Sequence, residues 1–348
     1  MDRSTLPTEQ DLTEQLNDLL RGVGARPDEF SVKLAREIMH TAVKLIQDEA
    51  DTGELKLISR SLKELRYALK VFRDYSHIRK VSIFGSARTP DDHPAYQTAV
   101  AFSRKMAERG WMVITGAGGG IMRAGHGGAG RDASFGVAIR LPFETTANEY
   151  IEGDRKLIVF RYFFTRKLIF ASQSHAMALL PGGFGTQDEG FEILTLIQTG
   201  KAPIVPVVLL DSPDSDYWSN WDQHVRRDLL GQELINPEDL NLYMVTKDVD
   251  AAVDHLFTFY RNYHSLRFVR AILVIRMMRP LNPDQMARLN DEFADLVVDG
   301  KIEQGGPLSA EHEHLELPRL RFIFTRRQYG RLRLMIDRIN EFDLEAGT

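Results

Sequence analysis

Apolar and polar residues change their spacing twice along the chain, which divides it into three parts. In residues 1–77, apolar residues recur every three or four positions, which predicts three helices, over residues 9–21, 29–50 and 54–76. Asp28 is expected to cap the second helix, and Gly53 to separate it from the third. We therefore expect a helical N-terminal extension over residues 1–77.

Short apolar runs alternate with amphipathic segments in residues 78–263. The runs predict strands at Val81–Phe84, Met112–Thr115, Phe135–Ile139, Leu157–Phe160, Ala176–Leu180, Ile204–Leu210 and Tyr243–Val245. Helices are predicted near residues 94–109, 120–131, 162–173, 186–199, 218–230 and 249–262. Unbroken apolar strands are typical of a parallel sheet with helices on both faces. The fold class predicted is α/β, a doubly wound (Rossmann-like) sheet with its ligand at the carboxyl ends of the strands.

Residues 264–348 show a third pattern, which predicts a small α+β domain of β-α-β-β-α order. Its elements are a strand at Val269–Met277, a helix at 282–297, a weak strand at Lys301–Gly306, a strand at Leu320–Thr325 and a helix at 328–341. Seven arginines lie between Arg319 and Arg338 against one acid, Asp337. One interpretation is a solvated basic face. The other is a regulatory site for a nucleotide effector, because clustered arginines suit phosphates.

Composition excludes several classes of protein. The 348 residues are 27% charged and 43% hydrophobic, as in an ordinary globular protein of two or three units. A net charge of −5 gives no reason to expect nucleic-acid binding, and the absence of cysteine excludes disulfides, thiolate metal sites and a thiol nucleophile. The start MDRSTLPTEQDL has no signal-peptide core, and no apolar run is long enough for a membrane span. We expect a cytoplasmic protein.

Three glycine-bearing loops follow predicted strands: Gly85-Ser86-Ala87-Arg88, Gly116-Ala117-Gly118-Gly119-Gly120 and Gly182-Gly183-Phe184-Gly185-Thr186. In a parallel sheet all three fall on one edge, so their amides are expected to face one pocket, although glycines also serve tight turns alone. The dinucleotide-binding motif G-x-G-x-x-G is incomplete, because Gly116 and Gly118 are followed by Ile121 at the position of the third glycine. The sequence also lacks the phosphate-binding P-loop motif G-x-x-x-x-G-K-[ST]. Binding of NAD and hydrolysis of ATP are therefore not indicated.

The most informative run is Pro181–Glu189. A buried strand ends at Pro181, glycines leave amides bare, and a helix is predicted to open with Thr186 near its cap and Asp188 and Glu189 in its first turn. Bare amides at a helix N-terminus favour a phosphate, whereas carboxylates repel it. This combination suits a phosphorylated substrate whose reacting atom develops positive charge close to its phosphate.

These residues resemble the Lonely guy (LOG) family, once labelled lysine decarboxylase-like, whose hallmark is P-G-G-x-G-T-x-x-E. The resemblance covers about residues 78–262 and includes Gly85-Ser86, Gly118-Gly119-Gly120-Ile121-Met122, Leu141-Pro142-Phe143-Glu144 with Asn148, and Arg166-Lys167. It implies a Rossmann-like homodimer that hydrolyses nucleoside 5′-monophosphates such as AMP to a free base and ribose 5-phosphate. The terminal additions favour ordinary nucleotides over the cytokinin ribotides of plant-type members.

Carried over residue by residue, the resemblance implies that Arg166 and Glu189 are the catalytic pair. It implies substrate contacts by Gly85, Ser86, Gly118, Gly119, Gly120, Glu144, Lys167, Gly182, Gly183, Phe184, Gly185, Thr186, Gln187 and Asp188. Asp188 stands where many members have Glu, and Arg123 where relatives carry Gly or Glu, which adds a cation near the phosphate loop. These departures bear on substrate preference rather than on reaction type.

Cleavage of a ribosyl C–N bond builds positive charge at the anomeric carbon, which a carboxylate stabilises. Glu189 is the candidate, and the helix amides and Arg166 are expected to keep its pKa low enough for ionisation. Arg166 suits either the phosphate or the departing base.

The alternative to an enzyme is a carrier that binds a nucleotide or a molybdopterin-type cofactor without cleaving it. Lys167 is not expected to act as a Schiff-base lysine, because nothing else indicates pyridoxal phosphate. His312, Glu313 and His314 alternate in a loop, which is a poor geometry for metal binding. We expect no metal, no cofactor, and no nucleic-acid or membrane partner.

Overall fold

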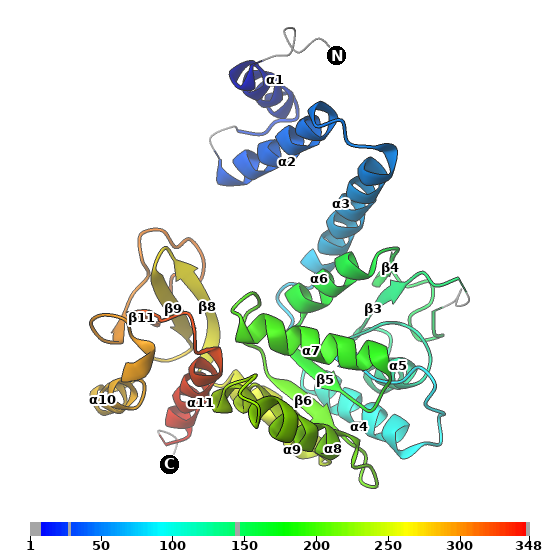
Figure 1. The fold of residues 1–348 in the computed structure, drawn as a ribbon, viewed down its shortest axis with the longest axis vertical. Coiled ribbons are helices and arrows are strands. Elements are labelled where there is room, and N and C mark those ends of the chain that lie inside the picture. Colours follow the sequence, from blue (N-terminus) through cyan, green and yellow to red (C-terminus); the bar gives the residue numbers. More distant parts are fainter. Residues whose placement is uncertain (1–7, 27–28, 143–146, 346–348) are drawn as a thin grey trace. The chain divides into compact units, whose positions relative to one another are not determined.

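The computed structural model describes residues 8–26, 29–142 and 147–345, and packing divides the chain into two compact units, Met1–Arg66 and Tyr67–Thr348. The first unit holds α1 (Glu9–Gly22), α2 (Phe30–Gln47) and most of α3 (Thr52–Arg73), which continues into the second unit (Figure 1). Gly53 therefore lies in the first turn of α3 and separates no helices, because Asp51 and Glu54 exchange hydrogen bonds across that turn. Asp28 lies outside the described residues.

A seven-stranded, all-parallel sheet forms the centre of the second unit and confirms the predicted fold class. Its strand order is β4-β3-β2-β1-β5-β6-β7, so the order reverses between β1 and β5. The strands are β1 (Lys80–Phe84), β2 (Met112–Thr115), β3 (Ser134–Ile139), β4 (Leu157–Phe160), β5 (Ala176–Leu179), β6 (Val207–Leu210) and β7 (Tyr243–Thr246). β6 begins three residues later than predicted, because Pro206 has no N–H to donate to the ladder.

Helices cover both faces of this sheet. α4 and α5 pack together against β1 and β2, whereas α6 contacts β3 and β4. Since crossovers between parallel strands are right-handed, the reversal of strand order places the later helices on the opposite face. The elements are α4 (Pro94–Glu108), α5 (Ile121–Ala129), α6 (Phe163–Gln173), α7 (Phe184–Gln198), α8 (Tyr217–His224), the π-helix η2 (Val225–Leu230), the 3-10 helix η3 (Pro237–Leu242) and α9 (Val249–Phe259).

The C-terminal part forms an antiparallel sheet of order β10-β11-β9-β8 with two helices. Its elements are β8 (Tyr263–Val269), β9 (Ile272–Met277), α10 (Pro283–Glu292), the 3-10 helix η4 (Ala294–Leu296), β10 (Glu303–Gly305), β11 (Arg319–Ile323) and α11 (Tyr329–Glu345). The predicted order β-α-β-β-α was wrong by one strand. β8 is a half-buried edge strand, so it lacks the unbroken apolar run of a central strand. The turn into β9 has Arg270, with a φ of 56°, where a glycine would have indicated a turn in the sequence.

α11 joins the C-terminal part to the parallel-sheet part, because it contacts α7, α9 and η3. Residues 67–348 accordingly form one compact unit, and the boundary placed between residues 263 and 264 stays a prediction. None of the described helices is both long and apolar enough to cross a membrane.

Gly200 offers a test of this junction. It ends α7 with a φ of 68°, and a Cβ there would lie 2.0 Å from the Tyr329 hydroxyl of α11. Gly110 ends α4 with a φ of 83° and has open space around it, so it is a matched control. We expect Gly110→Ala to cost about 1 kcal/mol of unfolding free energy, from backbone strain alone. Gly200→Ala should cost clearly more in urea unfolding, and equal losses would contradict the close approach.

Candidate functional site

The three glycine loops meet at the carboxyl edge of the sheet, where the strand order reverses. Backbone hydrogen bonds connect them directly: Ser86 N donates to Pro181 O at 3.1 Å, and Ile121 N donates to Ser86 O at 3.0 Å. The expected convergence of the loops is therefore present. In doubly wound sheets this crevice is where ligands bind.

Two glycines make this contact possible. Gly120 has a φ of 57°, and a Cβ there would lie 2.2 Å from Ser86 O. A Cβ on Gly182 would lie 2.1 Å from the Thr186 Oγ1 atom. A side chain at either position would push the loops apart, so these glycines serve close backbone packing as well as turn geometry.

α7 begins at Phe184 with Gly183 as its N-cap, two residues earlier than predicted. Thr186 therefore lies buried in the first turn, whereas Asp188 and Glu189 lie beyond it, so their predicted place in the first turn was wrong. Because the first N–H groups of an α-helix have no intrahelical acceptor, the amides of Phe184 and Gly185 are available to a ligand. Phe184 is 95% exposed at this point.

A cavity of about 760 Å³ opens over these amides, and we call it the glycine-loop cavity. It is lined by Phe84, Gly85, Ser86, Ala87, Arg88, Gly116, Met122, Phe163, Arg166, Gly182, Gly183, Phe184, Gly185, Thr186, Gln187, Asp188, Glu189 and Tyr217. Both members of the predicted catalytic pair, and most of the predicted substrate contacts, lie here together.

A second cavity, also of about 760 Å³, adjoins the first one. The two share Ala87, Gly116, Met122 and Arg166. The second cavity has a more apolar lining, which includes Ala138, Ile139, Leu141, Pro142, Leu157 and Val159. The site is therefore a pair of compartments with a common wall.

Arg166 stands in that common wall. Its Nε donates to Val137 O at 2.8 Å, and its guanidinium lies 5.0 Å from the centre of the Phe170 ring. A Cβ on Gly116 would lie 2.5 Å from the Arg166 Nη2 atom, so the missing side chain makes room for the guanidinium. The arginine is thus fixed between the compartments rather than extended into solvent.

Glu189 lines the glycine-loop cavity with only 11% of its side chain exposed. Burial raises the pKa of the Glu189 carboxyl to about 7, although the charges of Lys167 and Arg166 oppose the shift. The expectation that the helix amides and Arg166 keep the pKa of Glu189 low was therefore wrong. Removal from water outweighs the two cations, as for a carboxyl in an apolar pocket.

Four predicted substrate contacts lie elsewhere. Gly118 lines the second cavity, whereas Gly119, Gly120 and Lys167 line neither cavity. Gly119 and Gly120 instead form the turn that packs on the first loop. Glu144 lies outside the described residues, so its place is not determined.

Asn148 holds the second glycine loop in its shape. Its backbone N donates to Ala117 O at 2.8 Å, and its Nδ2 donates to Gly118 O at 3.0 Å. This fixes Ala117 at a φ of 64°, a strained value for a residue with a Cβ. The fully buried His126, whose pKa is lowered by burial, hydrogen-bonds with Asn148 Oδ1 from the other side.

Arg123 does not add a cation to the site, contrary to expectation. It forms ion pairs with Asp91 and with Glu149, the latter at 2.6 Å. The hydrogen bonds that Arg123 donates to these two carboxylates raise its pKa above the ordinary range. Its charge is therefore neutralised at the rim of α5.

Tyr217 is a site residue that the sequence reasoning missed. It begins α8, and its hydroxyl donates to Gly182 O at 2.5 Å while accepting from Gln187 Nε2 at 2.5 Å. This hydroxyl thereby connects the turn at Gly182 to the start of α8, which follows β6. The sequence gives no local signal for this, because the contact joins residues 35 positions apart.

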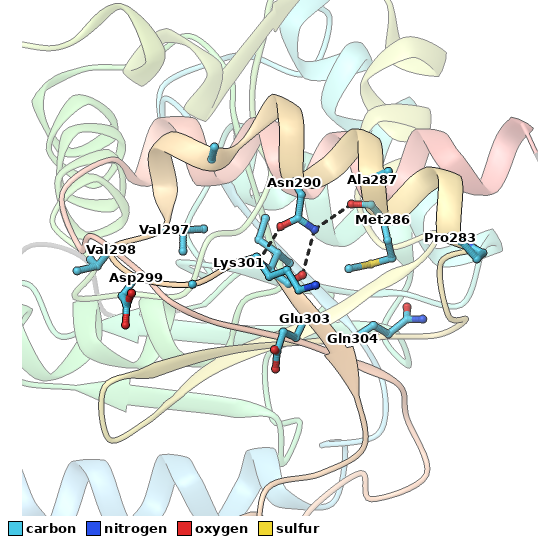
Figure 2. A pocket seen from close by; sticks show the side chains of 13 residues that line it. Pro283, Met286, Ala287, Asn290, Val297, Val298, Asp299, Lys301, Glu303 and Gln304 are labelled. Atoms are coloured by element: carbon cyan, nitrogen blue, oxygen red, sulfur yellow. Dashed lines mark hydrogen bonds between the residues drawn. The ribbon is translucent and has the colours of Figure 1, made fainter.

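A further hollow lies in the C-terminal part, between α10 and the edge strand β10 (Figure 2). Two of its polar side chains bond to nearby backbone groups: Asn290 bonds Ile302 and Met286, and Gln304 bonds Leu281. The titratable residues in its lining, Asp299, Lys301 and Glu303, are all exposed. Among the described residues, no group of three or more His, Cys, Asp or Glu could hold a metal ion.

Residues 119–256 match the family model described as "Possible lysine decarboxylase". This match confirms the resemblance to the LOG family over these residues. No curated protein matches the chain. Among solved structures, the chain is similar to the molybdenum cofactor carrier protein of Chlamydomonas reinhardtii, at 22% sequence identity and a TM-score of 0.37. The match covers 52% of this chain and 98% of the Chlamydomonas protein. A molybdenum cofactor binding protein of Rippkaea orientalis has 20% identity, coverages of 51% and 94%, and a TM-score of 0.35.

The raised pKa of Glu189 predicts a pH-dependent cost to stability. An unfolded glutamate has a pKa near 4.5, so folding favours the protonated form, and stability falls as pH rises from about 4.5 to 7. Glu189→Gln should therefore raise the melting temperature at pH 8 more than at pH 5. The difference in unfolding free energy should approach about 2–3 kcal/mol. An equal gain at both pH values in calorimetry would show that Glu189 ionises normally.

Proposed function

We propose that this protein hydrolyses the N-glycosidic bond of nucleoside 5′-monophosphates, giving a free base and ribose 5-phosphate. One observation carries the proposal: the bare amides that open α7 and the buried carboxyl of Glu189 line the same cavity. The amides suit a phosphate, whereas the carboxylate repels it. A ligand that satisfies both has its phosphate at the helix end and a carbon that gains positive charge beside Glu189.

The spacing along α7 supports this arrangement. Glu189 follows Phe184 by five residues, which corresponds to about 7.5 Å along the helix axis. This distance is on the order of the length of a ribose 5-phosphate between its phosphorus and anomeric carbon. The phosphate would anchor the sugar, and the binding energy gained there would hold the anomeric carbon against the carboxylate while the bond breaks.

In this proposal Glu189 stabilises the oxocarbenium-like sugar and takes a proton from the attacking water. A pKa near 7 places the carboxyl where it both ionises and accepts a proton at neutral pH. Activity of the free enzyme is accordingly expected to rise with pH through about 7 and to level off above it.

Arg166 supports placing the base in the second cavity. Because its guanidinium lies in the wall between the two compartments, it is near the bond that joins sugar and base in this pose. Its charge would stabilise the electrons that the departing base gathers. The apolar surfaces of Ile139, Leu141 and Val159 face a flat ring without selecting one base, which fits general purine or pyrimidine nucleotides.

Two other activities receive less support. A carrier for a nucleotide or a molybdopterin-type cofactor would use the same amides, but it has no need for a buried carboxyl beside the sugar. A lysine decarboxylase would need a lysine with a lowered pKa to form a Schiff base. Burial lowers the pKa of Lys167, but hydrogen bonds to Glu192 and Asp188 outweigh it and leave the pKa above its usual value.

The nucleotide effector expected at the C-terminal arginines is also less supported. Arg319 bonds Glu311 within the core, Arg331 pairs with Asp295, and Arg333 pairs with Asp337. Arg321 and Arg338 likewise pair with carboxylates. These ion pairs favour a structural role for most of the cluster.

Replacing the proposed catalytic pair tests the function directly. Arg166→Ala should reduce ribose 5-phosphate release from AMP, GMP, IMP, CMP or UMP at least a hundredfold, roughly the effect of losing one transition-state contact. Glu189→Gln should abolish release while nucleotide binding, measured by calorimetry, persists. Arg104→Ala, an exposed arginine of α4, is the control. Full activity in Glu189→Gln would refute the mechanism, and binding without release by the wild type would favour a carrier.

The homodimer that the family resemblance implies is supported by one surface of α6. Phe163, Phe164 and Leu168 are each 53% exposed there, on the helix that also carries Arg166. Such a cluster of apolar side chains is typical of a protein interface. We expect light scattering to show a dimer and Phe164→Glu with Leu168→Glu to give a monomer. A monomeric wild type would contradict this assignment.

A further inference from the structure

Lys167 lies at the centre of a cluster of three carboxylates on α7. Its Nζ is 2.9 Å from Asp188 Oδ2 and 3.9 Å from Glu189 Oε2, and it also forms an ion pair with Glu192. The lysine side chain is only 15% exposed, whereas Asp188 and Glu192 are 62% and 36% exposed. The ammonium is thus a largely buried partner shared among three acids.

The lysine reaches Glu189 from the side away from the glycine loops. Lys167 and Glu192 line a small hollow on this side, and Glu189 lines both that hollow and the glycine-loop cavity. Lys167 itself does not line the glycine-loop cavity. It therefore pairs with the proposed catalytic carboxyl without lining the cavity over the amides.

We propose that Lys167 is a positioning residue, not a substrate contact: it holds Asp188 and Glu192 and leaves Glu189 as the carboxyl presented to the sugar. The inference rests on the proposed function, since it assigns how that site is controlled. Glu192, which follows Glu189 by three residues on α7, pairs with the same ammonium. Its negative charge therefore disfavours ionisation of Glu189, whereas the positive charge of Lys167 favours it.

The charges around Glu189 determine the direction of each effect. α6 contributes the cations Arg166 and Lys167, and α7 contributes the anions Asp188 and Glu192. Loss of the lysine leaves two unbalanced anions beside Glu189, which disfavours its ionised form. Loss of the Glu192 charge removes one of these anions and frees the ammonium for Glu189. The two substitutions should therefore change the acidity of Glu189 in opposite directions.

Three variants of the full-length protein test this: Lys167→Met, Lys167→Arg and Glu192→Gln. The Glu189 carboxyl is titrated by NMR with 13C-labelled glutamate, and its signal is assigned by its absence in Glu189→Gln. The acidic limb of kcat/KM for AMP hydrolysis is measured in parallel. The titration requires no activity, so it separates this inference from the proposed function.

We expect Lys167→Met to move the Glu189 titration, and the acidic limb with it, upward by one pH unit or more, the usual scale for one charge at this distance. Lys167→Arg should bring the Glu189 titration midpoint back to within roughly half a pH unit of the wild-type value. Glu192→Gln should move this midpoint to lower pH. An unmoved titration in Lys167→Met, or a rise in KM with an unmoved limb, would overturn the proposal in favour of a substrate contact. Expected titrations without nucleotide hydrolysis in the wild type would support the positioning role and reject only the enzyme.

Discussion

The contact of three loops at the reversal of strand order is the constraint on which the site depends. β1 and β5 are neighbours, and their following loops are joined through the backbone at Ser86 and Pro181. This closeness requires glycine at positions 120 and 182, and it leaves the first amides of α7 facing a cavity. The exposure of these amides thus follows from how the backbone packs, and the turn from Gly182 to Thr186 carries no cationic side chain.

Much of the fold could be predicted because parallel strands are buried on both faces and therefore appear as apolar runs. The glycine loops could be placed together for the same reason, since parallel strands end at one edge. β8 was missed because an edge strand alternates with polar residues and its turn at Arg270 lacks glycine. A strand could be predicted where burial on both faces requires a run of apolar residues, and it was missed where burial on one face does not.

The site shows where such reasoning stops. The position of Glu189 on the helix suggested an ionised group, but its pKa depends on how much water the fold removes, which is not local information. Lys167 adjoins Arg166 in the sequence and yet faces the other side of Glu189, toward Glu192. Tyr217 reaches Gly182 only because β6 and β5 are adjacent. The surroundings of Glu189, Lys167 and Tyr217 each depend on side chains or backbone from another helix or strand, which the sequence near each residue does not reveal.

Both added segments connect to the sheet at its amino-terminal edge. α3 leads into the start of β1, and α9, which returns from the carboxyl end of β7, leads into β8. The glycine loops occupy the opposite edge. A segment at either end of the chain could therefore be lengthened or removed without interrupting a loop that contributes to the cavity.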